Sequence, residues 1–488
     1  MSEKIYVPDM SDAENALANK LLESIEQKGV RNRVRSAYYD GRKVARMLTD
    51  VVPVQYQQMG LTLGWASKAV DGLVRRTVID EFTSTGGPDL GSLGYVELCE
   101  RNFLFSELAQ ARTDSALHGV SYLVTTLGVN DDESRALVHA KSALDGTGDW
   151  NDRARRLDNF LSIMDRDERQ VTAFALYLPG LIISAEHGKG GWKSTRHTHP
   201  WGVPVEMLVH KPRTSRRRGK SRITRPVMGL QDAALRSLLR IEGHMDIYAI
   251  PQMVISGAME DMFRNADGST KSSMQIVMGR VLGIPDDEDA TTPRASVQQF
   301  SAESPRPHIE QINMLAKLMA RETNLPDSDF ALTDFANPTS GDSYIQGRDD
   351  LITEAEGAMD DWSPAIRRTV RRALAMQNGL GAVPREFDAI REQWRDPRYT
   401  SRAAAADAGM KQVASVPWLA ETRVGLKLLG LSTEQVDEAL AERRVAVGRS
   451  VVEAVLNANS GADTGGDAAG DTVGGAGSAG AGAEDASS

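Results

Sequence analysis

A run of cations, KPRTSRRRGKSRITRP, occupies Lys211 to Pro226 and places eight Lys or Arg residues in sixteen positions. The chain as a whole carries a formal net charge of −10. Cations at this density could neutralise the phosphates of nucleic acid. The run, however, lacks the interleaved aromatic side chains on which bases stack, and it leads directly into a helical pattern. Its composition therefore raises the question of DNA contact without answering it. The candidate residues are Arg216, Arg217, Arg218, Lys220 and Arg222.

A second candidate for chemistry is HGKGGWKST, His187 to Thr195, which at first looks like a phosphate-binding loop. Such a loop requires glycine directly before the lysine, and it must lead from a strand into a helix. Trp192 occupies the glycine position, and the following TRHTHPWG is not a helix start. We predict the tip of a β-hairpin here, and no ATPase site.

Catalytic and metal-binding patterns are not found. The acidic stretch Asp286 to Asp289 lacks the spacing of a calcium loop, and the pair Asp360-Asp361 is interpreted in the same way, as solvated charge. The eight histidines are scattered, and none accompanies a recognisable nucleophile. The single cysteine, Cys99, excludes an internal disulfide. We expect neither an enzyme nor a cofactor or metal.

Composition limits the class of protein that must position these residues. A chain of 488 residues with 41% hydrophobic and 25% charged residues predicts a globular protein of several structural units. No apolar run approaches the length of a membrane span, and the first residues lack the apolar core of a signal peptide. We therefore expect no membrane partner and no export. If the protein meets DNA, its acidic balance favours letting the DNA pass over holding it.

The first half of the chain reads as an α+β unit. Residues 12–28 place Leu17, Leu21, Leu22 and Ile25 on one stripe of a helix, with Asp12 as its expected cap. A second helix is predicted near residues 62–76. Short strands dominate from about 119 to 204, among them VSYLVTTL, RQVTAFALYL and LIISAEH.

Two long helices follow, at 226–249 and 307–323, and enclose a small mixed insertion. Thr224 is the expected cap of the first helix. Its expected wet face carries Gln231, Arg236 and Arg240. Apolar residues recur with helical spacing on the other side, at Val227, Ala234, Leu238, Ile241, Met245 and Tyr248. Ile309, Ile312, Leu315 and Met319 form the stripe of the second helix. We interpret the pair as a stalk that carries a head.

The last part of the chain begins with a polar stretch. Pro326, Pro338 and Gly341 interrupt any helix before a long helical pattern resumes through Ile352 towards Trp362. Ser432 and Gln435 occupy capping-box positions of a further helix. From Ser460 onward the sequence is rich in Gly, Ala and Asp and has no basic residue, which predicts a disordered acidic tail.

Three groups of segments together carry a resemblance to a known family. They are GKSRITRPVMGLQDAALRSLLRIEGHMDIYAIPQMVISG at 219–257, ARETNLPDSDFALTDFANPTSGDSYIQGRDDLITEAE at 320–356 and, more weakly, GWASKAVDGLVRRTVIDEF with ALHGVSYLVTT. The chain resembles the bacteriophage portal proteins of the type that includes the portal of phage SPP1, and in particular their relatives from actinobacterial phages. The likeness extends over roughly residues 12–450.

The resemblance implies a mostly helical α+β portal fold, assembled as a ring. Its parts would be a wing at 1–210, a basic junction at 211–225, a stem helix at 226–249 and a clip at 252–305. A second stem helix at 307–323, a tunnel loop at 327–340, a wing helix with its connection at 341–399, a crown at 400–458 and the disordered tail at 459–488 would complete the chain.

The same resemblance implies a function. A dodecameric ring at one capsid vertex would be the channel for double-stranded DNA in packaging and ejection. It would dock the terminase large subunit, the head-tail adaptor and the major capsid and scaffold proteins. Such a protein is assembled in the host cytoplasm and ends in the virion. The alternatives are another ring-shaped head-tail connector, or a nuclease or motor component of DNA packaging.

Particular residues acquire expected roles in such a ring. The stem channel would present Gln231, Arg236 and Arg240. The basic junction has three interpretations: pairing with acidic residues of a neighbouring subunit, a solvated turn, or contact with DNA. The tunnel loop contains Asp327, Asp329 and Asp334 and no Lys or Arg. We therefore expect weak polar guidance of DNA from Asn337, Thr339 and Ser340 rather than a basic clamp.

Overall fold

The computed structural model describes residues 4–42, 60–128, 133–167, 170–248, 253–256, 268–269, 296–299, 304–330, 348–398 and 402–461. These residues fall into two compact units, Met1–Arg398 and Tyr399–Ser488. The first unit holds all the sheets and the expected stalk. The second is helical in its described part.

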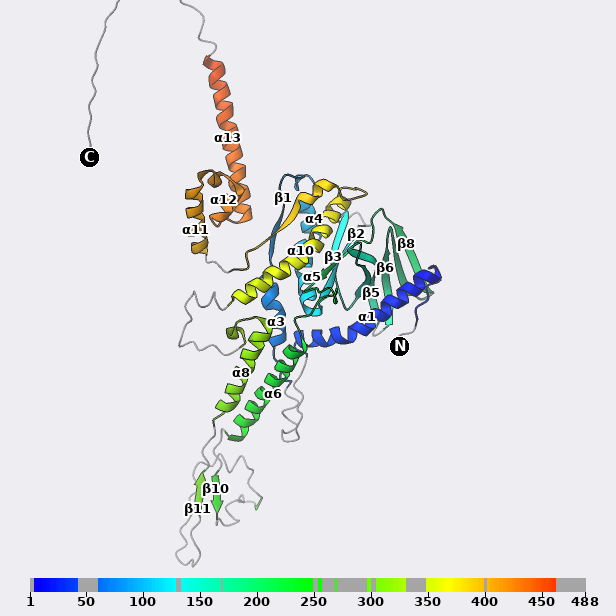
Figure 1. The fold of residues 1–488 in the computed structure, drawn as a ribbon, viewed down its shortest axis with the longest axis vertical. Helices are drawn as coiled ribbons and strands as arrows, with labels where there is room; N and C mark the ends of the chain where they lie inside the picture. Colours follow the sequence, from blue (N-terminus) through cyan, green and yellow to red (C-terminus); the bar gives the residue numbers. More distant parts are fainter. Residues whose placement is uncertain are drawn as a thin grey trace, which may run out of the picture. The chain divides into compact units, whose positions relative to one another are not determined.

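Two antiparallel sheets are stacked in the first unit. The larger has the strand order β4-β5-β6-β7-β8, and the smaller has β3-β2-β9. Helices cover the outer face of each sheet, so the unit is built of helix, sheet, sheet and helix layers (Figure 1). The strands are β2 (Val120–Leu127), β3 (Ala136–Ser142), β4 (Gly146–Asn151), β5 (Arg156–Asp167), β6 (Gln170–Leu178), β7 (Leu181–Gly188), β8 (Gly191–Thr198) and β9 (Val205–Val209).

Alternation along the strands explains this stacking. In β6, Phe174 and Leu176 point to one face and Ala175 and Tyr177 to the other, because successive side chains of a strand alternate. Tyr177 packs with Phe160 and, through it, with Tyr122 of β2, at ring-centroid distances of 5.8 and 4.7 Å. β2 is covered on both faces, and its sequence VSYLVTTL is accordingly an almost unbroken apolar and small run.

Helix α1 (Asp12–Tyr39) covers the outer face of the larger sheet with the predicted stripe, of which Leu21, Leu22 and Ile25 are buried. Its expected cap was wrong by one residue. Ser11 is the N-cap: its Oγ accepts from the backbone N–H of Glu14 (3.3 Å), and the Glu14 carboxylate accepts from the N–H of Ser11 (2.8 Å). A hydroxyl three residues before a glutamate completes a capping box, which Asp12 could not form.

Helices α5 (Leu104–His118) and α10 (Asp349–Gln377) cover the outer face of the smaller sheet, β3-β2-β9. The indole N–H of the fully buried Trp362 donates to Ser115 Oγ (3.0 Å) and joins the two helices. Ile352, Ala355 and Met359 are buried as their spacing predicted. Around them lie α3 (Trp65–Val74), α4 (Tyr95–Arg101) and the two-stranded sheet of β1 (Ile79–Ser84) and β12 (Ile390–Trp394).

Helices α6 (Arg225–Tyr248) and α8 (Arg306–Thr323) run side by side, as the expected stalk requires (Figure 1). The rings of His244 and His308, near the end of one helix and the start of the other, are 5.5 Å apart, so the pair is antiparallel. Thr224 caps α6 as predicted, since its Oγ1 accepts from the N–H of Val227 (3.4 Å). Strands β10 (Met253–Ser256) and β11 (Ser296–Gln299), from the sequence between the helices, pair antiparallel.

The buried stripe of α6 is rotated from the prediction. Leu235 and Leu239 are 1% exposed, whereas Leu238 is half-buried and Met245 is 44% exposed. The helix packs against α3 as well as α8, so its buried face is wider and shifted relative to a single apolar stripe. Because of this shift, Gln231 lies on the buried face of α6.

Two smaller predictions are confirmed. Strands β7 and β8 form a hairpin whose last pair is Gly188 with Gly191, so Lys189 and Gly190 are its tip and the segment is not a phosphate loop. In the second unit, Ser432 and Gln435 exchange the two capping-box hydrogen bonds (3.0 and 3.2 Å) at the start of α13.

The second unit contains α11 (Arg402–Ser415), α12 (Arg423–Leu428) and α13 (Thr433–Gly461). The helix extends to Gly461, and the remainder of the predicted tail lies outside the described residues.

Candidate functional site

The carboxylate of Glu354 fastens the basic segment 211–225 to α10. Glu354 Oε1 lies 2.5 Å from Nη1 of Arg222 and also accepts from Nζ of Lys211. The side chains of Arg222 and Glu354 are 4% and 6% exposed, so this ion pair is buried. The other oxygen of Glu354 accepts from the side-chain amide of Asn324 (3.2 Å), which follows the last residue of α8. Glu354 thus joins the wide body of the unit to the end of α8.

Arg222 connects further elements through its remaining donors. Its Nη2 donates to the backbone oxygen of Thr323 at the end of α8 (2.6 Å), and its Nε donates to the backbone oxygen of Ala69 in α3. The expectation that Arg222 faces a neighbouring subunit or DNA is therefore wrong. A guanidinium has five donors in a rigid fork, and here that fork holds three helices of one chain together.

Opposing influences act on the Glu354 carboxyl. Burial alone raises its pKa, but the charge of Arg222 and the hydrogen bonds from Lys211 and Arg222 outweigh burial and lower the pKa to about 2. The group is therefore ionised at every physiological pH. Asp361, about two turns further along α10, accepts from the backbone N–H of Lys211 (3.0 Å). The expected solvated pair Asp360-Asp361 therefore includes one residue that anchors the basic segment.

The base of the basic segment is a close backbone crossing. Gly219 has φ +62°, and a Cβ there would be 2.6 Å from the backbone oxygen of Gly119 and closer still to that of His210. The ring Nδ1 of His210 donates to the backbone oxygen of Lys220 (2.7 Å). Burial lowers the pKa of His210 to about 4, so the ring is neutral at pH 7.

The four remaining predicted cations of the basic segment fall into two groups: Arg217 and Arg218 contact β4 and the β4–β5 turn, whereas Arg216 and Lys220 do not. Arg218 donates to Thr147 Oγ1 (2.9 Å) and to the backbone oxygen of Gly148 (2.7 Å), and Arg217 Nε lies 3.0 Å from Asp152 Oδ1. These residues hold the segment against β4 and the β4–β5 turn. Within the described part of the chain, the side chains of Arg216 and Lys220 have no such partner, and Lys220 is exposed.

The predicted channel residues of α6 do not share one face. Gln231 is fully buried, and its Oε1 accepts from the backbone N–H of Ala66 at the start of α3 (2.8 Å). Its assignment to the channel is wrong, because the wide packed face of α6 includes this position. Arg236 is half-buried and Arg240 is exposed.

The predicted tunnel loop is described only at its start, residues 327–330. Arg348 Nη2 lies 3.2 Å from Asp329 Oδ1, and Lys68 Nζ donates to the backbone oxygen of Asp329 (2.6 Å). Phe330 packs edge-on against Trp65 at a ring-centroid distance of 5.8 Å. Asp327 is exposed in a short 3-10 turn, Asp327–Asp329. Asp334, Asn337, Thr339 and Ser340 lie outside the described residues.

Sequence reasoning missed a second group of charges, on α10. The buried Glu206 of β9 accepts from Arg368 (2.8 Å) and Arg372, and Glu392 accepts from both ends of the Arg367 guanidinium (2.7 Å each). The signal was the run RRTVRR at 367–372, in which arginines recur four positions apart on a helix. Its glutamate partners are too distant in sequence to be found from the run.

No group of three or more metal-ligating side chains occurs in the described ranges; Asp286 to Asp289 lie outside them. Among the helices that the structure describes, none has the length and apolar character that a bilayer span requires. The charges found here hold chain segments to one another. This arrangement defines a class of fold: a layered body joined to a helical stalk at a buried ionic junction.

Comparison with known proteins agrees with that class and narrows it. The family model described as phage portal protein, SPP1 Gp6-like, matches residues 20–446. The portal protein of Mycobacterium phage D29 is 23% identical over 459 residues, which cover 92% of this chain and 93% of the relative. The portal protein of Mycobacterium phage L5 is 24% identical over 415 residues, covering 83% and 84%.

The chain therefore belongs to the SPP1 Gp6-like family of phage portal proteins. The resemblance to actinobacterial-phage portals is confirmed by the two mycobacteriophage relatives. Membership places the chain among the structural components of a phage virion.

Solved structures of gene transfer agent (GTA) particles are also similar. A chain from the neck of an empty GTA particle shares 13% identity at a TM-score of 0.41, with 76% of this chain and 90% of that chain covered. A chain from the neck of a native GTA particle shares 14% identity at a TM-score of 0.37, with 82% and 99% covered.

Proposed function

We propose that the chain forms a dodecameric ring at one capsid vertex, and that double-stranded DNA passes through its centre during packaging and ejection. The observation that carries this proposal is the match of the portal family model from residue 20 to 446, which includes nearly all of the body, the paired helices and about half of the second unit. Assembly would take place in the host cytoplasm before the ring enters the virion.

The division into portal parts belongs to the same proposal. Residues 1–210 with 341–399 form the wing, and 226–249 and 307–323 form the stem. Residues 252–305 form the clip, 327–340 the tunnel loop, 400–458 the crown and 459–488 the tail. The antiparallel α6 and α8, which enclose the proposed clip in the sequence, support the assignment of the stem. The junction 211–225 joins wing to stem, as the hydrogen bonds of Arg222 lead us to infer.

The surface offered to DNA is proposed to bind it weakly. Of the proposed stem-channel residues, Arg240 is exposed and Arg236 half-buried, whereas Gln231 is excluded by its burial. Asp327 at the start of the proposed tunnel loop adds negative charge. Since each phosphate contact adds to affinity, few cations and some carboxylates favour sliding over retention. Asp329 would instead act at the base of the loop, through Arg348.

The proposed partners follow from the position of such a ring. The clip would meet the terminase large subunit during packaging and the head-tail adaptor afterwards. The wing would meet the major capsid and scaffold proteins. Of the alternatives, a motor component is disfavoured, because its one candidate phosphate-binding loop, His187 to Thr195, forms a hairpin. Another type of connector is disfavoured by the family to which the chain belongs.

Electron microscopy of the purified full-length protein, with native mass spectrometry of the same sample, tests the proposal. We expect closed rings with an open centre wide enough for a DNA duplex, and a mass of twelve chains. Compact monomers or dimers, both alone and after co-expression with the capsid and scaffold proteins, would contradict it.

A further inference from the structure

One face of α1 carries a row of cations. Lys28, Arg31 and Arg35 follow one another at intervals of three and four residues, so they lie on the same side of the helix. Lys28 and Arg31 are exposed on this side of the helix, whereas Arg35 lies at its border with the buried side. None of these cations belongs to the ion pairs described above.

Arg35 is the buried member of the row, with 9% of its surface exposed. Its Nη1 donates to Asn32 Oδ1 (3.2 Å) and to the backbone oxygen of His118 (3.1 Å), which are both neutral acceptors. Its Nε is buried and has no hydrogen-bond partner within the described residues. Buried arginines are normally paired with a carboxylate, so an acceptor is needed that the described chain does not supply.

The basic segment approaches this row through a shared backbone turn. His118, which accepts from Arg35, is followed by Gly119, whose oxygen accepts from the N–H of His210 (3.0 Å). A Cβ at Gly119 would lie 3.1 Å from the backbone oxygen of Arg218. Arg216 and Arg218 are therefore brought next to the cations of α1.

Neighbouring positive charges contribute to lowering the pKa values of Lys28 and Arg35. Burial lowers the pKa of Lys28 to about 8, with a further contribution from the charge of Arg218. Burial likewise lowers the pKa of Arg35 to about 10, helped by Arg31 and Arg216. The carboxylate that acts on Lys28, Asp149, is itself paired with Lys20 at 2.9 Å. Like charges held together in this way destabilise the isolated chain, which is typical of a site that awaits a ligand.

We propose that Lys28, Arg31, Arg35, Arg216 and Arg218 form an anion-binding site that receives carboxylate side chains from a second copy of this chain. The proposal rests on the ring assembly inferred above. It keeps Arg216 and Arg218 of the five predicted cations, adds three residues of α1, and names the chemistry of the group that binds.

A carboxylate fits the site better than a nucleic-acid backbone. Because little of Arg35 is exposed, only a narrow group such as a single side chain can reach it. The chain has a net charge of −10 despite this cluster, so the rest of its surface carries an excess of carboxylates. Complementary charge at a subunit contact fixes register and excludes wrong partners.

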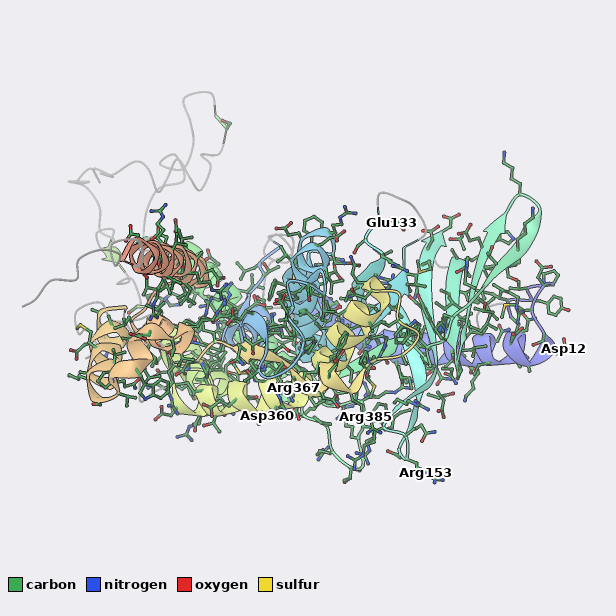
Figure 2. The ribbon with its side chains drawn as sticks, turned by 90° about the horizontal axis from the view of Figure 1, so that it is seen from above. Asp12, Glu133, Arg153, Asp360, Arg367 and Arg385 are labelled. Atoms are coloured by element: carbon green, nitrogen blue, oxygen red, sulfur yellow. The ribbon has the colours of Figure 1, made fainter. Side chains whose placement is uncertain are left out.

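The location suits a ring contact. Arg217 pairs with Asp152 in the β4–β5 turn, which also contains Arg153. Figure 2 shows Arg153 and Glu133 at opposite edges of the first unit. Contacts between two different faces are heterologous, and such contacts close into rings when the rotation permits. The basic face of one copy would then meet the opposite face of the next.

The test is a double variant, Arg31→Ala with Arg216→Ala, compared with the wild type in full-length protein. Native mass spectrometry over a protein dilution series measures the midpoint between rings and monomers. We expect this midpoint to rise about tenfold or more, which corresponds to roughly one lost interfacial charge pair. The monomer, separated at high salt, should melt at the same temperature as the wild type or higher, because repulsion is relieved.

Two further variants complete the design. Arg33→Ala removes a charge from the opposite side of α1 and should leave the midpoint unchanged. Arg31→Lys with Arg216→Lys keeps both charges and should restore most of the assembly. A midpoint for the alanine variant equal to that of the wild type overturns the proposal.

Fluorescence anisotropy with a labelled DNA duplex tests whether the site binds DNA phosphates instead of carboxylates. If the double variant keeps its rings and loses affinity for the duplex, the site binds phosphate and the carboxylate proposal is wrong. If wild-type protein stays monomeric at every concentration and salt level, the ring itself fails and this contact fails with it. Wild-type rings accompanied by intact variant rings overturn the contact alone.

Discussion

Individual charged residues are used in two opposite ways in this chain. Arg222 and Glu354 are buried together, and each satisfies the other. Arg35 is buried without a carboxylate. An unpaired buried charge costs far more free energy than a paired one. The pair of Arg222 and Glu354 therefore stabilises a single chain, whereas the unpaired Arg35 indicates that a further group binds there.

The first arrangement makes Glu354→Gln a sharp test. Removing the carboxylate leaves Arg222 buried without its counter-charge, so we expect the free energy of unfolding to fall by about 3–5 kcal/mol at pH 7. Urea denaturation followed by circular dichroism measures it. Glu356→Gln, on the same helix but in a long and exposed pair with Arg398, is the matched control and should cost at most about 1 kcal/mol.

The same carboxyl predicts an acid dependence. The pKa of Glu354 falls from 4.5 to about 2 on folding, so its contribution to stability is complete above pH 4.5 and is lost as the pH falls towards 2. The wild type should therefore lose stability over this range by more than Glu354→Gln does. Parallel losses for the two proteins would show that the group is not ionised in the fold.

At the scale of elements, the junction between body and stalk depends on backbone proximity as well as charge. The segment 211–225 crosses the turn after α5 so closely that only glycine fits at position 219. The crossing brings Arg218 to β4 and leaves Arg222 beside the ends of α3 and α8. Geometry at one residue thus sets where several cations lie.

Gly219→Ala tests this dependence. A left-handed backbone costs a non-glycine residue roughly 1–2 kcal/mol, and crowding adds about 1–3 kcal/mol. We expect a loss of stability in thermal or urea unfolding, and weaker protection of the segment 211–220 in hydrogen exchange. Gly190→Ala, in the open tip of the β7–β8 hairpin, meets no atom within 4 Å and should change little. Equal effects of the two substitutions would contradict the crossing.

At the scale of the molecule, the three apolar clusters with their partly buried neighbours lie within residues 5–394, inside the first unit. The described residues of the second unit, 402–461, add none to them. The first unit should therefore fold without the second, which separates the stability of the body from that of the proposed crown.

A chain ending at Arg398 should unfold cooperatively, with a free energy within about 0.5 kcal/mol of the value for the same transition in the full chain. A chain ending at Ala389 is the control. It lacks β12, which pairs with β1 and supplies Glu392 to Arg367, and it should be clearly less stable. Failure of the longer fragment to fold would show that the second unit supports the first.

The sequence by itself determined the elements with strong local patterns. The stripe of α1, the strand Val120–Leu127, the hairpin at Trp192 and the capping box of Ser432 are all where the pattern predicted them. Periodicity and capping depend on residues within a few positions of one another, so a single sequence contains them. Family membership was also readable, from segments such as 219–257 and 320–356.

Only the tertiary structure decided which polar side chains are buried and what they meet. Gln231 looked exposed by its spacing, yet α3 covers it, and the backbone N–H of Ala66 in α3 donates to its amide oxygen. Arg222 joins oxygens that lie 101 and 153 residues away in the sequence. A helix face is wet or packed according to its neighbours, and those neighbours are chosen by how distant apolar surfaces fit together, which no local pattern specifies.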